Sequence, residues 1–563
     1  MGGKRMEIQE TSSNPQGSRI LALWFLILSF LILHAFFRFP LFLREGVSSF
    51  AVPSFEALLT VPVLFAIAWF WPRGRRTTAP VVAVIAESVF LFALADSLVE
   101  LNFNRPLSLV TDVGYLPDLF MLLKDALPLP SFLIGLALPG AIIAALGRGL
   151  ALLFARFCET AGKLEPRSRK TLIVLGGAAL AILGSELLPG PPVYGSSSFP
   201  WLAAEAKSVF GSRRYETERQ DRFRQLAMEE TPAGIAALDR LAGRDVFLFI
   251  LESYGYTLYA EADHFSMAES FLRRFETRLK EAGYFTVSNF LASPAFGGNS
   301  WLADSALVTG VWVPDQIAYE ALLKSDITPL AQRFNEAGYV TVNSMPATTQ
   351  DWREGEYFRF AKKYYYRDFD YRGPGFRWAP MPDQYAIDFV HRREVIPAED
   401  PLFVQFVMIS GHYPFSLIPR RLEDWSELGD GSPFADPGNV HSLPIPTGAA
   451  TAGSAGYAAA MEYQLDVVSD YAARFLAERK ALIIVVGDHQ PYSGITGKGK
   501  PTSVPIHALS RDPGMLKPFL ARGYTAGWVP RQPPPHAGLD TFLPGFLEDF
   551  TSPVRALPKG ADR

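Results

Sequence analysis

Cysteine is nearly absent from this sequence, because Cys158 is the only one among 563 residues. A single thiol excludes a disulfide framework and a cysteine-rich zinc site. A strong net charge is also missing, since 53 Lys and Arg residues face 57 Asp and Glu residues and leave a formal charge of -4. This balance gives no support for nucleic-acid binding. Aromatic residues make up 13% of the chain, which excludes a disordered protein.

Long apolar runs are crowded into the first 190 residues. A membrane-crossing helix needs roughly 20 mostly apolar residues, and five stretches meet or approach that length. They are Ile20–Phe37, Pro53–Trp71, Pro80–Leu98, Leu129–Phe154 and Thr171–Leu188. The first stretch is too long for a signal peptide, lacks a small-residue cleavage site and is followed by further spans. We therefore predict a membrane domain of five helices over residues 1–190.

The basic residues of the loops are unevenly divided between the two sides of these spans. Eleven Lys and Arg residues precede span one or separate spans two from three and four from five, whereas four lie in the intervening loops. Loops rich in Lys and Arg stay cytoplasmic. We therefore expect a multi-pass protein with a cytoplasmic N-terminus and an extracytoplasmic second half.

The second half alternates apolar runs with helical patterns. Four runs are apolar without alternation, which is typical of parallel strands covered on both faces. They are Val246–Leu251, Tyr339–Asn343, Leu402–Ile409 and Ala481–Val486. Helical patterns over Glu269–Glu281, Thr328–Ala337 and Tyr457–Lys480 separate them. This alternation predicts an α/β domain with a mainly parallel central sheet.

Composition sets the expected domain limits. We place a linker and connecting helix at residues 191–240 and the α/β domain at 241–530. The segments 420–456 and 529–563 are rich in Pro, Gly and Ser and are expected to be loop and tail. The tail proper is set at residues 531–563.

Three of the predicted strands run directly into titratable residues. The first strand is followed by Glu252, the third by Ser410-Gly411-His412, and the fourth by Gly487-Asp488-His489. Ligands bind beyond the carboxyl ends of such strands, so these side chains are expected at one edge of the sheet. Carboxylates and imidazole suit a divalent ion such as Mn²⁺, Mg²⁺ or Zn²⁺.

A candidate nucleophile lies in the segment Ala-Phe-Gly-Gly-Asn-Ser-Trp at residues 295–301. Ser300 precedes a predicted helix over Trp301–Val308, and amides at a helix N-terminus bind phosphate-type oxyanions. A metal on the Ser300 hydroxyl would lower its pKa and make it a nucleophile. The alternative is that Ser300 is an ordinary N-cap.

The order Leu-Glu-Ser, Gly-Gly-Asn-Ser, Gly-His-Tyr-Pro-Phe and Gly-Asp-His behind five predicted spans resembles the lipoteichoic acid synthase family. The resemblance covers almost the whole chain and implies a sulfatase-like domain of the alkaline phosphatase superfamily, outside the bacterial cytoplasmic (inner) membrane and thus extracytoplasmic or periplasmic. It implies one divalent metal, Mn²⁺ with Mg²⁺ or Zn²⁺ as alternatives. The implied ligands are Glu252, Ser300, Asp488 and His489. Ser300 stands where the family has Thr.

The resemblance also implies residues that contact the substrate. His412 would be catalytic and substrate-binding, and Trp352 and Arg353 would bind substrate, although their local spacing differs from that of the family. The implied reaction transfers a phosphoglycerol-type head group from a membrane phospholipid, phosphatidylglycerol first, through a covalent Ser300 intermediate. The acceptor would be a hydroxyl on a cell-envelope polymer or glucan.

Several alternatives use the same residues. A phosphoethanolamine transferase shares the architecture but usually carries exterior disulfides, and the second half of this chain has no cysteine. A membrane-anchored phosphodiesterase or phosphatase would use water as acceptor. A two-metal phosphatase would also need additional Asp or His ligands. His507 is a candidate for such a ligand, but we expect it to pack beside the site instead. A true sulfatase needs a Cys or Ser in a motif with Pro and Arg, which Ser300-Trp-Leu-Ala-Asp lacks. In a transporter or sensor, the exterior domain would only bind.

Overall fold

The computed structural model describes residues 15–116, 129–166, 199–229, 238–350, 352–443 and 450–552, with isolated positions between 117 and 177. The chain divides into two compact units. One comprises Met1–Leu101 and Arg105–Gly211, and the other Asn102–Asn104 and Ser212–Arg563. Each unit has hydrophobic core residues of its own.

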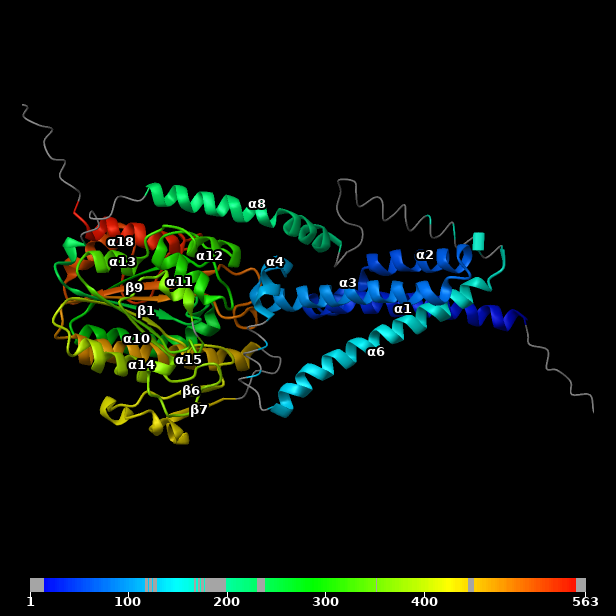
Figure 1. Ribbon diagram of the computed structural model, residues 1–563. Helices are drawn as coiled ribbons and strands as arrows, with labels where there is room; N and C mark the ends of the chain where they lie inside the picture. The colour runs from blue at the N-terminus through cyan, green and yellow to red at the C-terminus, as the bar shows by residue number, and fades with distance from the viewer. Residues whose placement is uncertain are drawn as a thin grey trace, which may run out of the picture. The chain divides into compact units, whose positions relative to one another are not determined.

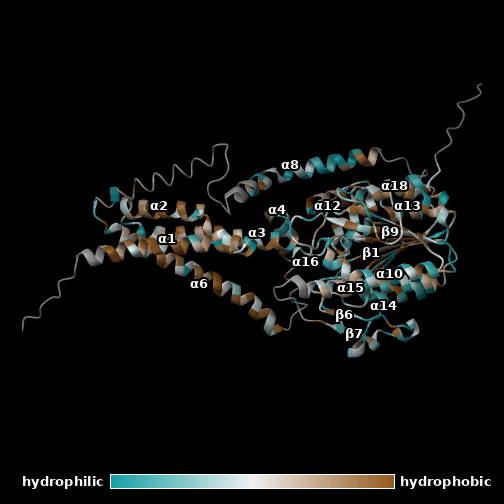
Figure 2. Ribbon diagram, turned by 180° about the vertical axis from the view of Figure 1, so that it is seen from behind, coloured by the Kyte–Doolittle hydropathy of each residue, from teal (hydrophilic) through white to brown (hydrophobic). Residues whose placement is uncertain are grey.

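The first unit is built from long apolar helices (Figure 2). They are α1 (Pro15–Glu45), α2 (Phe55–Phe70), α3 (Arg75–Phe103) and α6 (Leu129–Gly162), with the short helix α4 at Leu109–Asp112. Four stretches of the described residues could cross a membrane by length and composition: Ile20–Glu45, Val47–Phe70, Thr77–Phe103 and Leu129–Gly162. They confirm the first four predicted spans. The fifth, Thr171–Leu188, lies almost wholly outside the described residues, and the membrane orientation stays a prediction.

Polar side chains in these helices bind backbone groups of the α1–α2 connection. Arg38 is buried and donates a hydrogen bond from Nη2 to the Pro53 carbonyl oxygen at 2.6 Å. His34 lies 3.1 Å from the Phe50 carbonyl oxygen through Nε2 and accepts from the Ser54 N–H through Nδ1. Because lipid offers no hydrogen-bond partners, polar groups within a membrane must be satisfied by the protein. These contacts therefore stabilise the connection between two membrane helices.

The second unit contains an eight-stranded sheet in the order β10-β2-β9-β8-β1-β5-β3-β4. Its strands are β1 (Asp245–Leu251), β2 (Phe285–Ala292), β3 (Val340–Met345), β4 (Lys362–Tyr365), β5 (Leu402–Val407), β8 (Ala481–Gly487), β9 (Ser503–Ser510) and β10 (Thr525–Ala526). The five strands β8, β1, β5, β3 and β4 are parallel neighbours, and β9, β2 and β10 pair antiparallel. A mostly parallel sheet, as predicted, is thus confirmed. A separate hairpin joins β6 (Leu417–Pro419) to β7 (Val440–Ser442).

Helices cover both faces of this sheet (Figure 1). One face carries α10 (Ala262–Glu281), α14 (Asp383–Val390) and α15 (Ala450–Tyr471), and the other carries α11 (Ser300–Thr309), α12 (Gln316–Leu323), α13 (Leu330–Glu336) and α18 (Phe542–Phe550). Successive residues of β1 enter the two cores in turn: Phe247 and Phe249 pack on the first face, and Val246 and Leu248 on the second. A strand buried on both sides explains the unbroken apolar run in the sequence.

Shorter helices and one long helix complete the chain. They are α8 (Phe199–Glu229), α9 (Thr257–Ala260), α16 (Ser493–Thr496) and α17 (Lys517–Ala521). α8 lies within the segment for which the sequence predicts a connecting helix, while the predicted domain limits stay predictions. The segment expected to be a tail differs, because it contains α18. Phe542, Phe546 and Phe550 recur every fourth residue there and pack into the core, a pattern that the surrounding prolines obscure.

Candidate metal centre and active site

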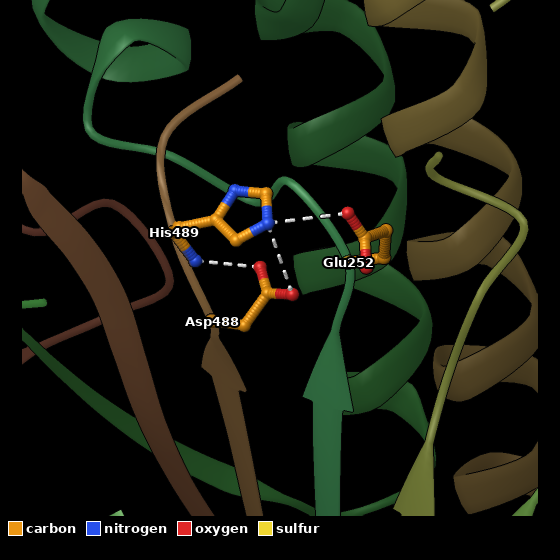
Figure 3. A group of neighbouring side chains, drawn as sticks. All are labelled: Glu252, Asp488 and His489. Atoms are coloured by element: carbon orange, nitrogen blue, oxygen red, sulfur yellow. Dashed lines mark hydrogen bonds and ion pairs between the residues drawn. The ribbon is translucent and has the colours of Figure 1, made fainter. Parts of the chain in front are cut away.

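Glu252 and the Asp488–His489 pair follow the two central strands of the sheet. β1 and β8 run parallel, and their register pairs Leu251 with Gly487, so both chains leave the sheet at the same edge. All three polar side chains are buried. They point toward one another at the strand ends (Figure 3). The topology therefore brings together residues that are far apart in the sequence.

The three side chains share one small space. One ligand atom from each lies within 4.8 Å of the ligand atoms of the other two. His489 Nε2 is 3.3 Å from Glu252 Oε1 and 3.6 Å from Asp488 Oδ2. A single cation placed among these atoms could be bound by all three side chains.

The backbone fixes which nitrogen of His489 faces this space. His489 Nδ1 lies 2.7 Å from the Gln490 carbonyl oxygen, which can only accept a hydrogen bond. Nδ1 therefore carries the proton, and Nε2 is directed at the two carboxylates. Metal-binding histidines are commonly oriented by such a bond from their second nitrogen.

The charges of the centre act strongly on one another. Burial alone would lower the pKa of His489, but the carboxylates of Asp488 and Glu252 outweigh burial and raise it. Burial and repulsion from Glu252 raise the pKa of Asp488. For Glu252, burial is the largest effect and acts upward, but the charge and hydrogen bond of His489 and the smaller effects of His412 and Ser253 together outweigh burial and lower the pKa. Two carboxylates in one buried space thus require a positive charge on the imidazole side.

The residues present fit a divalent cation. Among the ion pairs of the described residues, His489 is the only cationic partner of Glu252 and of Asp488. A cation bound at His489 Nε2 would supply the positive charge that a second proton otherwise supplies there. Two carboxylate oxygens and one imidazole nitrogen suit Mn²⁺ or Zn²⁺, and no thiolate is present to favour softer ions.

Ser300 faces the same centre. It is the first residue of α11, and its Oγ lies 3.2 Å from Glu252 Oε2 and 3.3 Å from His489 Nε2. Its hydroxyl donates to the Glu252 carboxylate, whereas the N-cap position belongs to Asn299. The interpretation of Ser300 as an ordinary N-cap is therefore wrong.

The loop before α11 adopts backbone angles that suit the close approach of Ser300. Gly297 has φ +67° and Gly298 φ +148°, and Asn299 follows at φ +62° without a side-chain cap. Glycine reaches such angles at little steric cost, and asparagine tolerates the left-handed region better than most residues. The Gly-Gly-Asn sequence therefore turns the chain sharply enough for α11 to begin beside the metal ligands.

His412 follows β5 at the same edge of the sheet. Its ring lies 6.1 Å from that of Trp378, and its Nδ1 is 2.8 Å from the Tyr413 carbonyl oxygen. Its charge contributes to lowering the pKa of Glu252, after the larger effect of His489, so His412 is near the centre. The buried Asp383 holds the preceding loop, because its carboxylate accepts the N–H groups of Ile409 and Ser410 at 2.8 and 3.1 Å.

Among the described residues, Trp352 and Arg353 make no direct contact with the ligand set. Trp352 stacks on Phe358 with ring centroids 5.5 Å apart and meets Tyr365 edge to face. Arg353 is exposed in a short 3-10 turn. No hydrogen bond or ring contact of the described chain joins either residue to Glu252, so their substrate role stays a prediction.

Two further residues near the ligands, Ser253 and Asp304, were not identified from the sequence. Ser253 touches both carboxylates, since its N–H donates to Asp488 Oδ1 at 2.8 Å and its Oγ donates to Glu252 Oε1 at 3.1 Å. Asp304 lies one helical turn beyond Ser300, and its Oδ1 is buried without a hydrogen-bond partner. Burial, then repulsion from Asp488 and Glu252, raises the pKa of Asp304. The four-residue spacing from Ser300 was the available signal for Asp304.

His507 lies in β9 and does not belong to the ligand group. Its Nε2 is 2.9 Å from the Tyr254 hydroxyl, and its Nδ1 is 2.7 Å from Ser288 Oγ. The ring also stacks on Trp528 with centroids 4.1 Å apart. His507 thus packs beside the site, as expected.

Comparison with known proteins gives similarity at the level of structure only. No family model matches the sequence, and no curated protein matches it. The lipoteichoic acid synthase LtaP from Listeria monocytogenes shares 14% identity over 47% of this chain and 65% of its own, with a TM-score of 0.34. This chain thus spans less than two thirds of that structure.

Two other solved structures show the same distant similarity. The Streptococcus pyogenes phosphoglycerol transferase GacH, in complex with sn-glycerol-1-phosphate, shares 12% identity over 52% of this chain and 74% of its own, with a TM-score of 0.34. The C-terminal periplasmic domain of phosphoethanolamine transferase EptC from Campylobacter jejuni shares 11% identity over 55% and 89%, with a TM-score of 0.36. The similar structures include both transferase types, and the head group stays a prediction.

Proposed function

We propose that this protein is a metal-dependent phosphotransferase that moves a phosphoglycerol-type head group from a membrane phospholipid to an acceptor hydroxyl. The observation that carries the proposal is Ser300 Oγ, held 3.2 Å from Glu252 Oε2 and 3.3 Å from His489 Nε2 at the start of a helix. A hydroxyl beside a buried divalent-ion site is the arrangement of an activated nucleophile. The motif order that resembles lipoteichoic acid synthases supports phosphatidylglycerol as donor.

The first half-reaction forms a bond between Ser300 Oγ and the donor phosphorus. Glu252 Oε2 accepts the hydroxyl hydrogen bond and so orients Oγ toward the phosphate. The bond from phosphorus to the diacylglycerol oxygen breaks, and the proton lost by Ser300 ends on that oxygen. A divalent ion held by Glu252, Asp488 and His489 would lower the pKa of the Ser300 hydroxyl and neutralise charge on the phosphate oxygens.

The second half-reaction restores Ser300. An acceptor hydroxyl attacks phosphorus, the bond to Ser300 Oγ breaks, and the proton of the acceptor returns to Oγ. His412, at the same edge of the sheet, would bind the phosphate or assist proton transfer at the leaving and attacking oxygens. Amides at the start of α11 would donate hydrogen bonds to the phosphate oxygens.

The membrane helices support a lipid donor. The described part of the chain that carries this centre also contains four helices of membrane-crossing length. Tethering confines the search for a lipid head group to the membrane surface. A phosphoethanolamine donor, or water as acceptor, would use the same residues, and the experiment is designed to separate these reactions.

The test is mass spectrometry of purified full-length protein incubated with Mn²⁺ and phosphatidylglycerol. We expect a glycerophosphate adduct on the peptide that contains Ser300, and diacylglycerol as co-product. Ser300→Ala should form no adduct, whereas Ser300→Thr keeps a hydroxyl and should form one. An adduct that persists in Ser300→Ala would refute the nucleophile.

Parallel incubations define the reaction type. An adduct from phosphatidylethanolamine but not from phosphatidylglycerol would replace the proposed donor. Steady release of free glycerophosphate at the same rate with and without glucan would identify water as the acceptor and a hydrolase as the enzyme.

A further inference from the structure

Ser253 contacts both carboxylates of the metal centre. Its backbone N–H donates to Asp488 Oδ1 at 2.8 Å, and its hydroxyl donates to Glu252 Oε1 at 3.1 Å. The His489 N–H also donates to Asp488 Oδ1, at 2.5 Å. Oδ1 of Asp488 is therefore bound by two backbone donors, and Oδ2 is the oxygen left for a cation.

The backbone of Ser253 makes this double contact possible. Its φ is +61°, in the left-handed region that non-glycine residues rarely adopt. Residues held in such angles cost free energy and persist where the surroundings determine them. The angle lets one residue direct its N–H toward Asp488 and its side chain toward Glu252.

A tyrosine from helix α15 stabilises this backbone conformation. Tyr457 of α15 is fully buried, and its hydroxyl donates to the Ser253 carbonyl oxygen at 3.1 Å. The same hydroxyl accepts the Gly255 N–H at 3.2 Å. Gly255 leaves no room for a side chain, because a Cβ there would lie 2.9 Å from both Gln490 Cα and Pro491 Cδ. The segment that carries Ser253 is thus fixed on both sides.

We propose that Ser253 is a positioning residue that orients both carboxylates of the metal centre. Its N–H binds Asp488 Oδ1, which leaves Asp488 Oδ2 toward His489 Nε2, and its hydroxyl donates to Glu252 Oε1. Glu252 Oε1 is also the oxygen that lies 3.3 Å from His489 Nε2, whereas Glu252 Oε2 accepts the Ser300 hydroxyl. The Ser253 hydroxyl thus fixes the rotation of the Glu252 carboxylate, with one oxygen toward His489 and the other toward Ser300. Supporting hydrogen bonds of this kind orient metal ligands and raise metal affinity.

The inference rests on the metal centre of the proposed function but not on the transfer reaction. Its test is equilibrium binding of Mn²⁺ to detergent-solubilised full-length protein, measured from the electron paramagnetic resonance signal of free Mn²⁺. A protein that binds Mn²⁺ with the expected pattern and forms no Ser300 adduct would leave this inference standing while the transferase proposal fails.

The decisive variant is Ser253→Gly. Glycine adopts a φ of +61° freely and keeps the N–H, so only the hydroxyl bond to Glu252 is lost. We expect the Kd for Mn²⁺ to rise roughly 10- to 100-fold, as for other residues that support metal ligands. A wild-type Kd for Mn²⁺ in this variant would overturn the proposal.

Two further variants separate positioning from folding. Ser253→Ala should lose the same Mn²⁺ affinity and also unfold at a lower temperature, since alanine keeps the strained angle without the hydroxyl bond. Ser293→Ala is the matched control: Ser293 is buried and its Oγ donates to the Asp488 carbonyl oxygen at 2.6 Å, but it touches no carboxylate. Ser293→Ala should keep the wild-type Kd. An equal loss of Mn²⁺ affinity in Ser293→Ala would assign the effect to general loosening and overturn the proposal.

Discussion

The two ends of the candidate site differ in how firmly the fold holds them. In the metal corner, defined by Glu252, Asp488 and His489, every side chain is buried and bound by neighbouring groups. We call His412, Trp352 and Arg353 the proposed substrate corner; Arg353 is exposed, and His412 and Trp352 are only half-buried. A cation needs ligands that are already in place. A lipid head group instead needs room to enter, and its binding supplies the missing contacts.

The largest effect is expected when the metal corner loses one ligand in the variant Asp488→Asn. Asparagine can still accept the N–H groups of Ser253 and His489, but it presents an NH₂ group where Oδ2 faces the other ligands. Metal ions contribute several kcal/mol to transition-state stabilisation, so adduct formation should fall by about 10³-fold or more. Mn²⁺ binding should be lost.

The stability of the same variant should move in the opposite direction. Burial and the Glu252 charge raise the pKa of Asp488, which means that its charged form is disfavoured in the metal-free fold. Without metal, Asp488→Asn should therefore unfold at the wild-type temperature or above it. Activity lost together with a lower unfolding temperature would mean that Asp488 acts chiefly in the fold.

The metal corner could largely be read from the sequence because it depends on strand order alone. Glu252 and Asp488 each follow an unbroken apolar run, and parallel strands end at the same edge of a sheet. Ser300 was also identified, although its contact with Glu252 needed the structure to decide against a capping role.

Other features depend on contacts that no local pattern encodes. Ser253 acts through a left-handed backbone angle that Tyr457 stabilises from α15, and neither the angle nor the partner is visible in Leu-Glu-Ser. The antiparallel strands β9 and β2 likewise contain polar residues, such as His507 and Ser288, that bond each other inside the sheet. Such residues interrupt the apolar runs on which strand prediction depends.

A smaller effect is expected from the substrate corner with His412→Gln. A hydrogen bond to a charged group contributes about 1.5–3 kcal/mol, so the KM for the lipid donor should rise roughly 10- to 100-fold. Mn²⁺ affinity should stay near the wild-type value, because no hydrogen bond among the described residues joins His412 to a ligand atom and its ring contacts Trp378. The control is His441→Gln, an exposed position in β7.

Measuring KM and kcat separately for His412→Gln distinguishes phosphate binding from proton transfer as the role of His412. A loss confined to kcat would assign proton transfer to His412 in place of phosphate binding. Loss of Mn²⁺ affinity in His412→Gln would remove the distinction between the two corners.

The smallest effect is expected for the free energy of unfolding at acid pH, through the buried hydrogen bonds of His507. Ser288 Oγ donates to the Gly527 carbonyl oxygen at 2.7 Å, so it must accept from Nδ1–H of His507, and His507 Nε2 then accepts from the Tyr254 hydroxyl. Neutral His507 satisfies every partner, and a second proton on Nε2 would face a donor. Burial lowers the pKa of His507 to about 3.

The sign of the pH effect follows from this lowered pKa. The unfolded chain takes up the proton near pH 6.5 and the folded chain does not, so His507 reduces the free energy of unfolding as pH falls below 6.5, by about 1.4 kcal/mol per pH unit at most. Burial raises the pKa of Asp383 to about 6, and this shift makes the free energy of unfolding rise as pH falls. The effect of His507 is therefore isolated by comparing wild type with His507→Gln, which share Asp383. In denaturant unfolding of the full-length protein, the wild-type advantage should shrink by about 1 kcal/mol between pH 6.5 and 5.5. A constant difference would show that His507 takes up its proton at the same pH in the folded and the unfolded chain, and that Tyr254, two residues beyond Glu252, is held in another way.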